Sequence, residues 1–235
     1  MKRCLIVVPL YNESIALPHL ISGFNDIQFR EKNFKHDILF INDGSDDGSE
    51  EILIENSVNY VSLINNLGIG GAMQCGYIFA AKNGYDYVIQ IDGDGQHPPG
   101  EILRLIAAAE KFDEDLIIGS RFISDIDYKP SIPRKLGMKY SSWLMRISTG
   151  IKIADTTSGF RLTKKDLVNY FAKEYPQQEA GLISLLMAAK AGFQFKEIPI
   201  KIDKRRYGKS SINILRAFLY PSKTMINSIA VAIRE

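Results

Sequence analysis

Short apolar runs alternate with segments of helical periodicity along the first half of the chain. The apolar runs end in polar or glycine-rich turns and lie at 4–9, 37–42, 60–64, 87–92 and 116–119. Their length and apolar content predict buried strands. The segments between them repeat apolar residues at three- and four-residue intervals, which predicts helices near 17–24, 73–80 and 102–109. Pro98 and Pro99 mark the start of the third helix.

This alternation predicts an α/β fold with an open, mostly parallel, Rossmann-like sheet and helices on both faces. The pattern loosens between 122 and 160, except for a helical stretch near 135–149. A further helix is expected at 180–190 and a short strand at 197–201. The amphipathic stretch at 212–233 predicts C-terminal helices. We therefore expect one domain over 1–211, followed by a helical tail over 212–235 that is not an independent domain.

Composition narrows the class of protein without giving its function. A chain of 235 residues, 46% of them hydrophobic, can bury a core without a disulfide or a structural metal. Cys4 and Cys75 lack the paired spacing of a disulfide framework or a zinc site. The net charge of +2 is too small to indicate nucleic-acid binding. The unpaired cysteines indicate a reducing cytoplasm. No secretory signal and no stretch long enough to span a membrane is evident, so we do not expect the chain to cross a bilayer by itself.

The most informative string is I-Q-I-D-G-D-G-Q-H-P-P at 89–99, in which an apolar strand runs into two carboxylates. Asp92 and Asp94 can converge on a hard divalent cation, and Gln96 can add a neutral oxygen. Mg²⁺ keeps its other coordination positions for water and phosphate oxygens, so the string indicates a diphosphate site. The alternative is an ordinary Asp-Gly turn, which the preceding strand disfavours. His97 is either a further ligand or a turn residue.

Two other strand ends carry polar residues. Ligands gather beyond the carboxyl ends of parallel strands, and I-N-D-G-S-D-D-G-S at 41–49 places Asp43 there. Its carboxylate can accept a hydrogen bond from a ribose or from a base N–H, although the string also suits a tight turn. Asp46 and Asp47 are expected to cap the following helix. The exit of the first strand supplies Tyr11 for stacking and Glu13 for a polar contact.

Taken in order, the strings resemble the family-2 glycosyltransferases of GT-A fold. They are most similar to the branch that contains dolichyl-phosphate mannose synthases and bacterial polyprenyl-phosphate glycosyltransferases. The resemblance runs from residue 4 to about 212 and is carried by V-V-P-L-Y-N-E, N-D-G-S-D-D-G-S, N-L-G-I-G-G-A, D-G-D-G-Q-H-P-P, G-S-R-F, D-T-T-S-G-F-R and R-R-Y-G-K-S-S. It implies an inverting, metal-dependent enzyme that uses Mg²⁺ or Mn²⁺. Such an enzyme moves a sugar from a UDP- or GDP-sugar to a polyprenyl-phosphate or glycan acceptor, in cell-surface polysaccharide or glycolipid synthesis.

The resemblance also implies roles for single residues. The donor would be bound by Pro9, Tyr11, Glu13, Asp43 and Asp92, with Arg121, Arg206 and Ser210 approaching its phosphates from the other side. The metal would be held by Asp92, Asp94 and Gln96, and Asp94 would act in catalysis through it. A cation and arginine donors stabilise the negative charge that develops on a departing nucleoside diphosphate.

The nature of the acceptor decides whether a base is needed. A hydroxyl acceptor must lose its proton during attack, and Asp155 and Glu179 are the candidate bases. Glu179 is equally well explained as a helix N-terminal acid. A lipid phosphate is already anionic at neutral pH and needs no base.

The C-terminal region is strongly basic before its apolar tail. The stretch 201–209 holds five cations in nine residues and is either a solvated face or a contact with an anionic membrane or lipid phosphate. Nucleic acid is the least favoured partner. The tail packs on the core, on a membrane or on a second subunit, so peripheral membrane attachment and a homo-oligomer both stay open.

The same residues allow three other functions. In N-L-G-I-G-G-A at 66–72, half of a dinucleotide fingerprint is present, but Met73 stands where a small residue is needed, against a dehydrogenase. A nucleotide-sugar pyrophosphorylase would need a glycine-rich, basic N-terminal loop, which V-P-L-Y-N-E does not provide. A nonenzymatic sugar-nucleotide or membrane-binding module is the remaining alternative, because it would keep the site without turnover.

Overall fold

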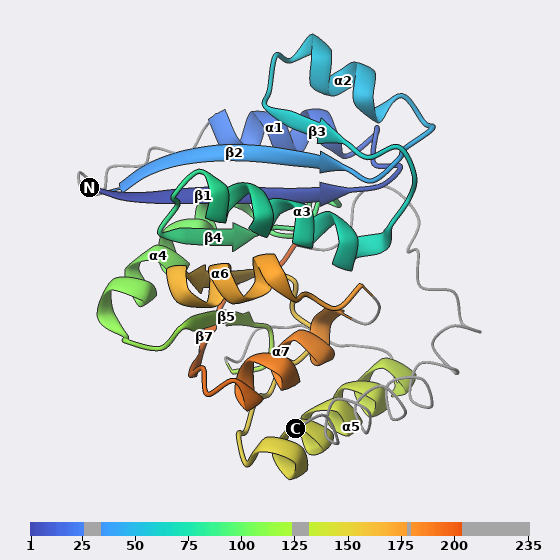
Figure 1. Cartoon of the computed structure of the whole chain (residues 1–235). Coiled ribbons are helices and arrows are strands. Elements are labelled where there is room, and N and C mark those ends of the chain that lie inside the picture. The colour runs from blue at the N-terminus through green and yellow to red at the C-terminus, as the bar shows by residue number, and fades with distance from the viewer. Residues whose placement is uncertain (26–33, 124–131, 178–179, 204–235) are drawn as a thin grey trace.

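The structure is a computed structural model that describes residues 1–25, 34–123, 132–177 and 180–203. Within these residues the chain forms one seven-stranded sheet in the order β3-β2-β1-β4-β6-β5-β7. The strands are β1 (Lys2–Leu10), β2 (Phe34–Asn42), β3 (Tyr60–Ser62), β4 (Tyr87–Gln90), β5 (Leu116–Ser120), β6 (Arg161–Lys164) and β7 (Phe195–Pro199). The predicted α/β class and mostly parallel sheet are confirmed (Figure 1).

One strand was not predicted. β6 runs antiparallel between β4 and β5, with Arg161 paired to Gln90 on one side and to Ile118 on the other. Its sequence, R-L-T-K, has no apolar run, so local pattern gives no signal for a buried strand. Its burial comes from the neighbouring strands and from the helices above them.

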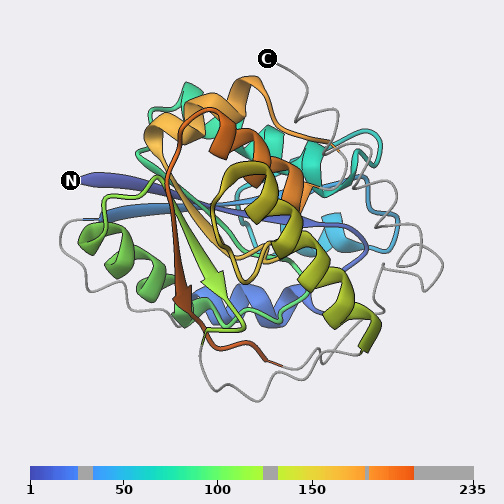
Figure 2. The same ribbon diagram turned by 90° about the horizontal axis from the view of Figure 1, so that it is seen from below.

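Helices cover both faces of the sheet, as predicted (Figure 2). One face carries α1 (Leu17–Asn25) and, after the short turn η1 (Pro99–Glu101), α4 (Ile102–Lys111). The other face carries α3 (Gly68–Lys82), α6 (Lys165–Lys173) and α7 (Ala180–Lys190). The short α2 (Ser49–Glu55) lies at the β3 edge, and α5 (Ile132–Thr149) packs against α7.

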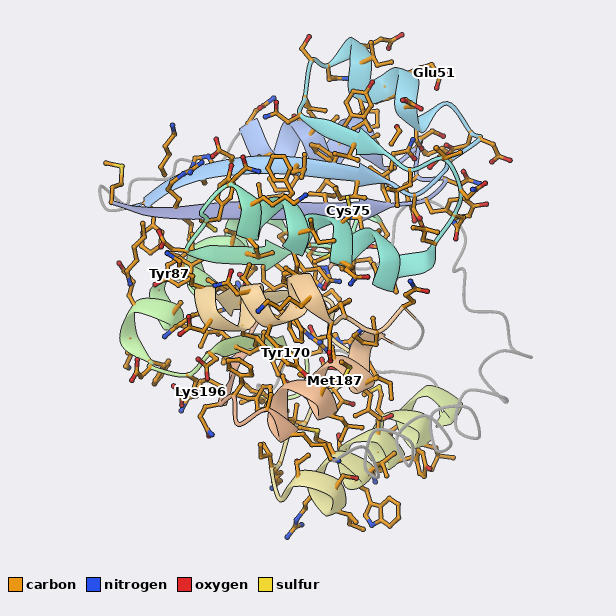
Figure 3. The ribbon with its side chains drawn as sticks, viewed as in Figure 1. Glu51, Cys75, Tyr87, Tyr170, Met187 and Lys196 are labelled. Atoms are coloured by element: carbon orange, nitrogen blue, oxygen red, sulfur yellow. The ribbon has the colours of Figure 1, made fainter. Side chains whose placement is uncertain are left out.

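Side chains of β1 alternate between the two apolar layers. Leu5 and Val7 join the cluster under α3, whereas Ile6 and Val8 join the cluster under α1 and α4. Because the strand is buried on both faces, its sequence is almost continuously apolar. The two cysteines lie on different elements: Cys4 is buried in β1, and Cys75 is half-buried on α3 (Figure 3).

No helix in the described ranges is long and apolar enough to cross a membrane. The predicted boundary between residues 211 and 212 lies outside the described residues. So do the tail helices predicted at 212–233 and most of the basic stretch at 201–209.

The contact between α3 and β1 gives a first prediction. A Cβ added at Gly76 would lie 2.6 Å from a methyl carbon of Val7. We expect Gly76→Ala to lower the free energy of unfolding by about 1–3 kcal/mol because the helix must move away from the strand. Gly137→Ala is the control, since no atom lies within 4 Å of its added Cβ. Denaturant unfolding that shows equal stability for both variants would contradict the close packing.

Candidate functional site

Three parallel strands end at the same edge of the sheet. Leu10 at the end of β1 is in register with Asn42 at the end of β2, and β4 lies parallel on the other side of β1. The chain stays close after the strands end. The Asp43 N–H donates to the Leu10 carbonyl at 2.9 Å, and the Gly93 N–H donates to the Pro9 carbonyl at 3.2 Å. The acidic loops after β2 and β4 therefore flank the exit of β1.

Asp43 anchors the start of α3. Its Oδ1 accepts a hydrogen bond from the Leu67 N–H at 2.7 Å, and the side chain is nearly fully buried. Burial raises the pKa of this carboxyl above its usual value, while hydrogen bonds from the Leu67 and Gly68 N–H groups act in the opposite direction. The predicted contact with a base or ribose stays a prediction. The structure adds that Asp43 shapes the loop that leads into α3.

The D-G-D loop after β4 holds the predicted metal ligands. Asp92 Oδ1 accepts a hydrogen bond from Gln90 Nε2 at 3.3 Å, and the Asp92 side chain is 34% exposed. Asp94 Oδ1 accepts from the Gln96 N–H at 3.0 Å, which tightens the turn. The Gln96 side chain is directed to residue 203, where its Nε2 donates to the Asp203 carbonyl at 3.4 Å.

His97 is a buried neighbour of the same loop. Its ring stacks on Phe160 with 5.1 Å between centroids, and its Nδ1 lies 3.9 Å from Asp92 Oδ2. In the part of the chain that is described, this buried Nδ1 has no hydrogen-bond partner. The imidazole is therefore buried beside the Asp92 carboxylate, and its role as a further ligand stays a prediction.

The residues present fit a metal that arrives together with a diphosphate. Among the described residues, no group of three or more His, Cys, Asp and Glu side chains is arranged to hold an ion by itself. Asp92 and Asp94 offer two carboxylates on one loop. Mg²⁺ is commonly bound by one or two carboxylates, with substrate phosphates and water completing its coordination. The donor set thus suits a substrate-linked cation better than a resident structural ion.

A second loop lies directly against Asp92. A Cβ added at Gly159 would lie 2.5 Å from Asp92 Oδ1, so a larger residue there would displace the carboxylate from its present position. Gly159 belongs to D-T-T-S-G-F-R, which leads into β6. The antiparallel direction of β6 brings this loop to the edge where β4 ends. The strings D-G-D and D-T-T-S-G-F-R, which are far apart in the sequence, therefore lie side by side at the candidate site.

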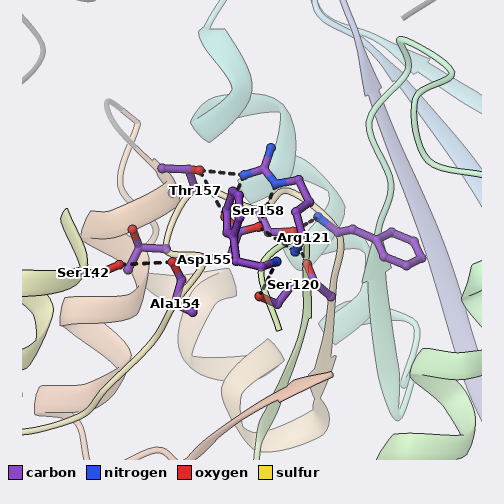
Figure 4. Close-up of polar contacts among 12 residues, drawn as sticks. Ser120, Arg121, Ser142, Ala154, Asp155, Thr157 and Ser158 are labelled. Carbon is purple, nitrogen blue, oxygen red and sulfur yellow. Dashed lines mark hydrogen bonds and ion pairs between the residues drawn. The ribbon is translucent and has the colours of Figure 1, made fainter. Parts of the chain in front are cut away.

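Within that loop, Asp155 is paired with Arg121 (Figure 4). Arg121 donates through Nε to Asp155 Oδ2 and through Nη2 to Asp155 Oδ1, both at 2.7 Å, and also to Thr157 Oγ1. Asp155 has no exposed surface and Arg121 is 6% exposed. Both carboxylate oxygens are occupied, so this geometry gives no support to the prediction that Asp155 is a base. It instead makes Asp155 the residue that positions Arg121.

Two further residues hold the loop in place, and sequence reasoning gave them no role. The buried Arg161 donates to the carbonyl oxygens of Ser158, Thr156 and Gly181 and to Ser184 Oγ. Glu197 on β7 accepts hydrogen bonds from the Ala154 and Asp155 N–H groups at 2.7 and 2.9 Å. The only sequence signal was a charged residue inside the apolar string F-R-L.

The exit of β1 carries the remaining described donor residues. Pro9 is in β1, Tyr11 is 46% exposed, and the Glu13 N–H donates to Ser49 Oγ at 3.2 Å. The expected capping of α2 by Asp46 and Asp47 is wrong, because the N-cap residue is Gly48, which makes no side-chain cap hydrogen bond. Asp47 Oδ1 accepts from the N–H of Ser49, the first residue of α2, at 3.1 Å. Asp46 instead accepts from Asn12 Nδ2. Glu179, Arg206 and Ser210 lie outside the described residues.

A cavity of about 220 Å³ adjoins the D-G-D loop. It is lined by residues of α1, of the segment from Asp94 to Pro99 and of the segment after β7, among them His19, Asp94, Pro98 and Asp203. A slightly larger cavity of about 270 Å³ lies between α1 and β2, toward the start of that strand. We place the site at the smaller cavity because Asp94 of the D-G-D loop lines it.

Comparison with known proteins defines the class. The family model "Glycosyl transferase family 2" matches residues 5–171. The chain therefore belongs to glycosyl transferase family 2, as its strings predicted. Membership in this family favours an enzyme over the two alternatives of a pyrophosphorylase and a nonenzymatic module.

Particular relatives refine this result. The chain is 27% identical to the undecaprenyl-phosphate mannosyltransferase of Micrococcus luteus, over 90% of this chain and 88% of that protein. It is 26% identical to the polyprenol monophosphomannose synthase of Mycolicibacterium smegmatis, over 90% and 82%. Among solved structures it is similar to glucosyl-3-phosphoglycerate synthase of Mycobacterium tuberculosis in complex with Mn²⁺, UDP and glucosyl-3-phosphoglycerate. That likeness has a TM-score of 0.70 at 15% identity, over 98% and 80% of the chains, and it confirms the predicted fold.

The buried pair gives a second prediction. Asp155→Ala would leave the Arg121 guanidinium buried without its carboxylate, and we expect a loss of about 3–5 kcal/mol in the free energy of unfolding. The matched control is Arg104→Ala. It removes a partly exposed pair with Glu101 and should cost less than about 1 kcal/mol. Equal denaturation midpoints for the two variants would show that the Asp155 pair does not support the fold.

Proposed function

We propose that this protein is an inverting glycosyltransferase that moves the sugar of a nucleoside diphosphate sugar to a polyprenyl phosphate. The observation that carries the proposal is the placement of Asp43, Asp92 and Asp94 at one sheet edge in a family 2 chain. Relatives whose names specify undecaprenyl phosphate and polyprenol support the choice of acceptor. We assign this activity to residues 1–211, with 212–235 as an accessory tail.

The reaction balances without an additional reactant. An anionic oxygen of the acceptor phosphate forms a bond to the anomeric carbon while the bond from that carbon to the donor diphosphate breaks. The nucleoside diphosphate leaves with the electron pair. A divalent cation held by Asp92 and Asp94, with Gln96 as a further oxygen donor, would supply charge neutralisation for the diphosphate. Asp43 would orient the nucleoside, and Tyr11 would stack on its base.

No base is required for this acceptor. A phosphate oxygen is already deprotonated, in agreement with an Asp155 carboxylate whose two oxygens are occupied by Arg121. A glycan acceptor would need a base, and Glu179 is then the remaining predicted candidate. In our proposal Arg121, fixed by Asp155 and Thr157, approaches the diphosphate as a hydrogen-bond donor. Arg206, from the basic stretch, and Ser210, which follows that stretch, would approach the phosphates from the same side.

A polyprenyl-phosphate acceptor places the reaction at a membrane. We propose that the protein acts at the cytoplasmic face as a peripheral enzyme. The basic stretch at 201–209 and the tail are the predicted contacts from sequence. A tail that pairs with a second subunit is the alternative.

The donor can be identified by a binding screen. UDP- and GDP-sugars are added with and without Mn²⁺, and the midpoint of thermal unfolding is measured. A ligand that binds only the native state at 100 times its dissociation constant stabilises it by about 2.7 kcal/mol. We expect either the UDP-sugars or the GDP-sugars to stabilise the protein, and only when Mn²⁺ is present. Metal-independent stabilisation would reject the role of Asp92 and Asp94.

Substitution of Asp94 gives a third prediction. Asp94→Asn removes one anionic metal ligand, and loss of several kcal/mol of charge stabilisation corresponds to a fall of about a hundredfold or more in turnover. Release of nucleoside diphosphate in the presence of polyprenyl phosphate is the readout. The exposed Asp113→Asn is the control and should keep full turnover. Full activity of Asp94→Asn, with its fold intact, would reject the proposed function.

A further inference from the structure

Helix α5 has one face in the core and one large apolar face outside it. Met138, Ser141 and Met145 are buried against the rest of the protein. Leu136, Trp143 and Ile147 are instead 63%, 55% and 63% exposed. Scattered exposed apolar residues are normal on a protein surface, but three large ones on a single helix call for an explanation.

The spacing of these residues makes them a continuous stripe. An α-helix turns by about 100° per residue, so positions 136, 143 and 147 fall within roughly 40° of one another. By the same turn, Met138, Ser141 and Met145 occupy the opposite side of the helix. Tyr140 extends the stripe, with its ring centroid 5.9 Å from that of Trp143. We call Leu136, Tyr140, Trp143 and Ile147 the α5 stripe.

Charge on the same helix has a single sign. The sequence of α5, I-P-R-K-L-G-M-K-Y-S-S-W-L-M-R-I-S-T, contains four basic residues and no acidic one. Lys135, Lys139 and Arg146 are exposed, and the helical turn places all three along one flank of the stripe. An apolar stripe with tryptophan beside a basic flank is the pattern of helices that lie in a membrane interface. The basic flank is complementary to anionic headgroups.

We propose that the α5 stripe docks on an anionic phospholipid bilayer, with the helix lying in the membrane plane. Leu136, Trp143 and Ile147 enter the boundary between headgroups and acyl chains, and the basic flank contacts lipid phosphates. This inference rests on the proposed function only in its choice of a membrane-borne acceptor. It adds an attachment surface within the described domain, separate from the basic stretch at 201–209 and the tail.

The same helix is joined to the candidate site. Ser142 Oγ on α5 donates to the Ala154 carbonyl at 3.2 Å, and the next residue is Asp155, which holds Arg121 (Figure 4). On the side away from the stripe, α5 therefore contacts the loop whose Asp155 holds this arginine.

Trp143 is the only tryptophan of the chain and reports on the stripe directly. Vesicles of phosphatidylglycerol and phosphatidylcholine are added to the full chain, and tryptophan emission is recorded. We expect a blue shift, and quenching by lipids brominated along their acyl chains. Vesicles of phosphatidylcholine alone should bind far more weakly, because the electrostatic attraction is missing.

Variants separate this surface from the rest of the chain. At about 1 kcal/mol per cation, Lys135→Gln/Lys139→Gln should weaken partitioning by about 30-fold, a change measured by vesicle sedimentation. Leu136→Ser/Ile147→Ser should also reduce it strongly. The matched controls are Lys82→Gln/Lys111→Gln and Ile54→Ser/Ile78→Ser, exposed residues on other helices, which should bind like the parent chain.

Four outcomes would overturn the inference. The first is tryptophan emission that does not change when anionic vesicles are added. The second is emission that is already blue-shifted without vesicles, because the tail covers the stripe. The third is emission that depends on protein concentration, because a second copy covers the stripe, and the fourth is an equal loss of binding in the control variants.

Failure of the proposed function gives a different result. Asp94→Asn should bind vesicles normally without turnover, whereas the α5 variants should turn over a short, water-soluble polyprenyl phosphate and lose activity only on vesicle-borne acceptor.

Discussion

The buried ion pair between Arg121 and Asp155 is the interaction on which the geometry of the site depends. A carboxylate with no exposed surface is tolerated only when its charge is paired and its oxygens are hydrogen-bonded, and Arg121 meets both needs. The loop that holds Asp155 is fixed further by Glu197 and Arg161. That loop then carries Gly159 to the Asp92 carboxylate. Charge compensation in the interior thus fixes the wall beside the proposed diphosphate.

The strands that bring the acidic residues together could be predicted because their signal is local. Apolar runs such as 4–9 and 87–92 are long enough to identify as strands. Because parallel strands end at one edge of a sheet, the acidic residues that follow them are expected to lie close together. β6 could not be predicted, because R-L-T-K owes its burial to neighbours and not to its own composition. The pairing of Arg121 with Asp155 joins residues 34 positions apart, and sequence shows two charges without showing that they neutralise each other.

Sequence also does not reveal which face of α5 is exposed to solvent. Helical periodicity near 135–149 predicts the element, but a helix with apolar residues on two sides does not reveal which side faces the core. Met138 and Met145 are buried, while Trp143, a larger apolar residue between them, is exposed. Only packing against α7 and the loop before Asp155 decides the orientation. Exposure of the stripe was therefore accessible from structure alone.

The reversed direction of β6 has a consequence for how such an enzyme could diversify. Strands β1, β2 and β4 deliver their loops to the edge as the chain leaves the sheet, while β6 delivers D-T-T-S-G as the chain enters it. The two sides of the candidate site are thereby encoded by separate stretches of sequence that meet only in space. A substitution in the later stretch can therefore alter one side of the site while the residues that follow β1, β2 and β4 stay unchanged.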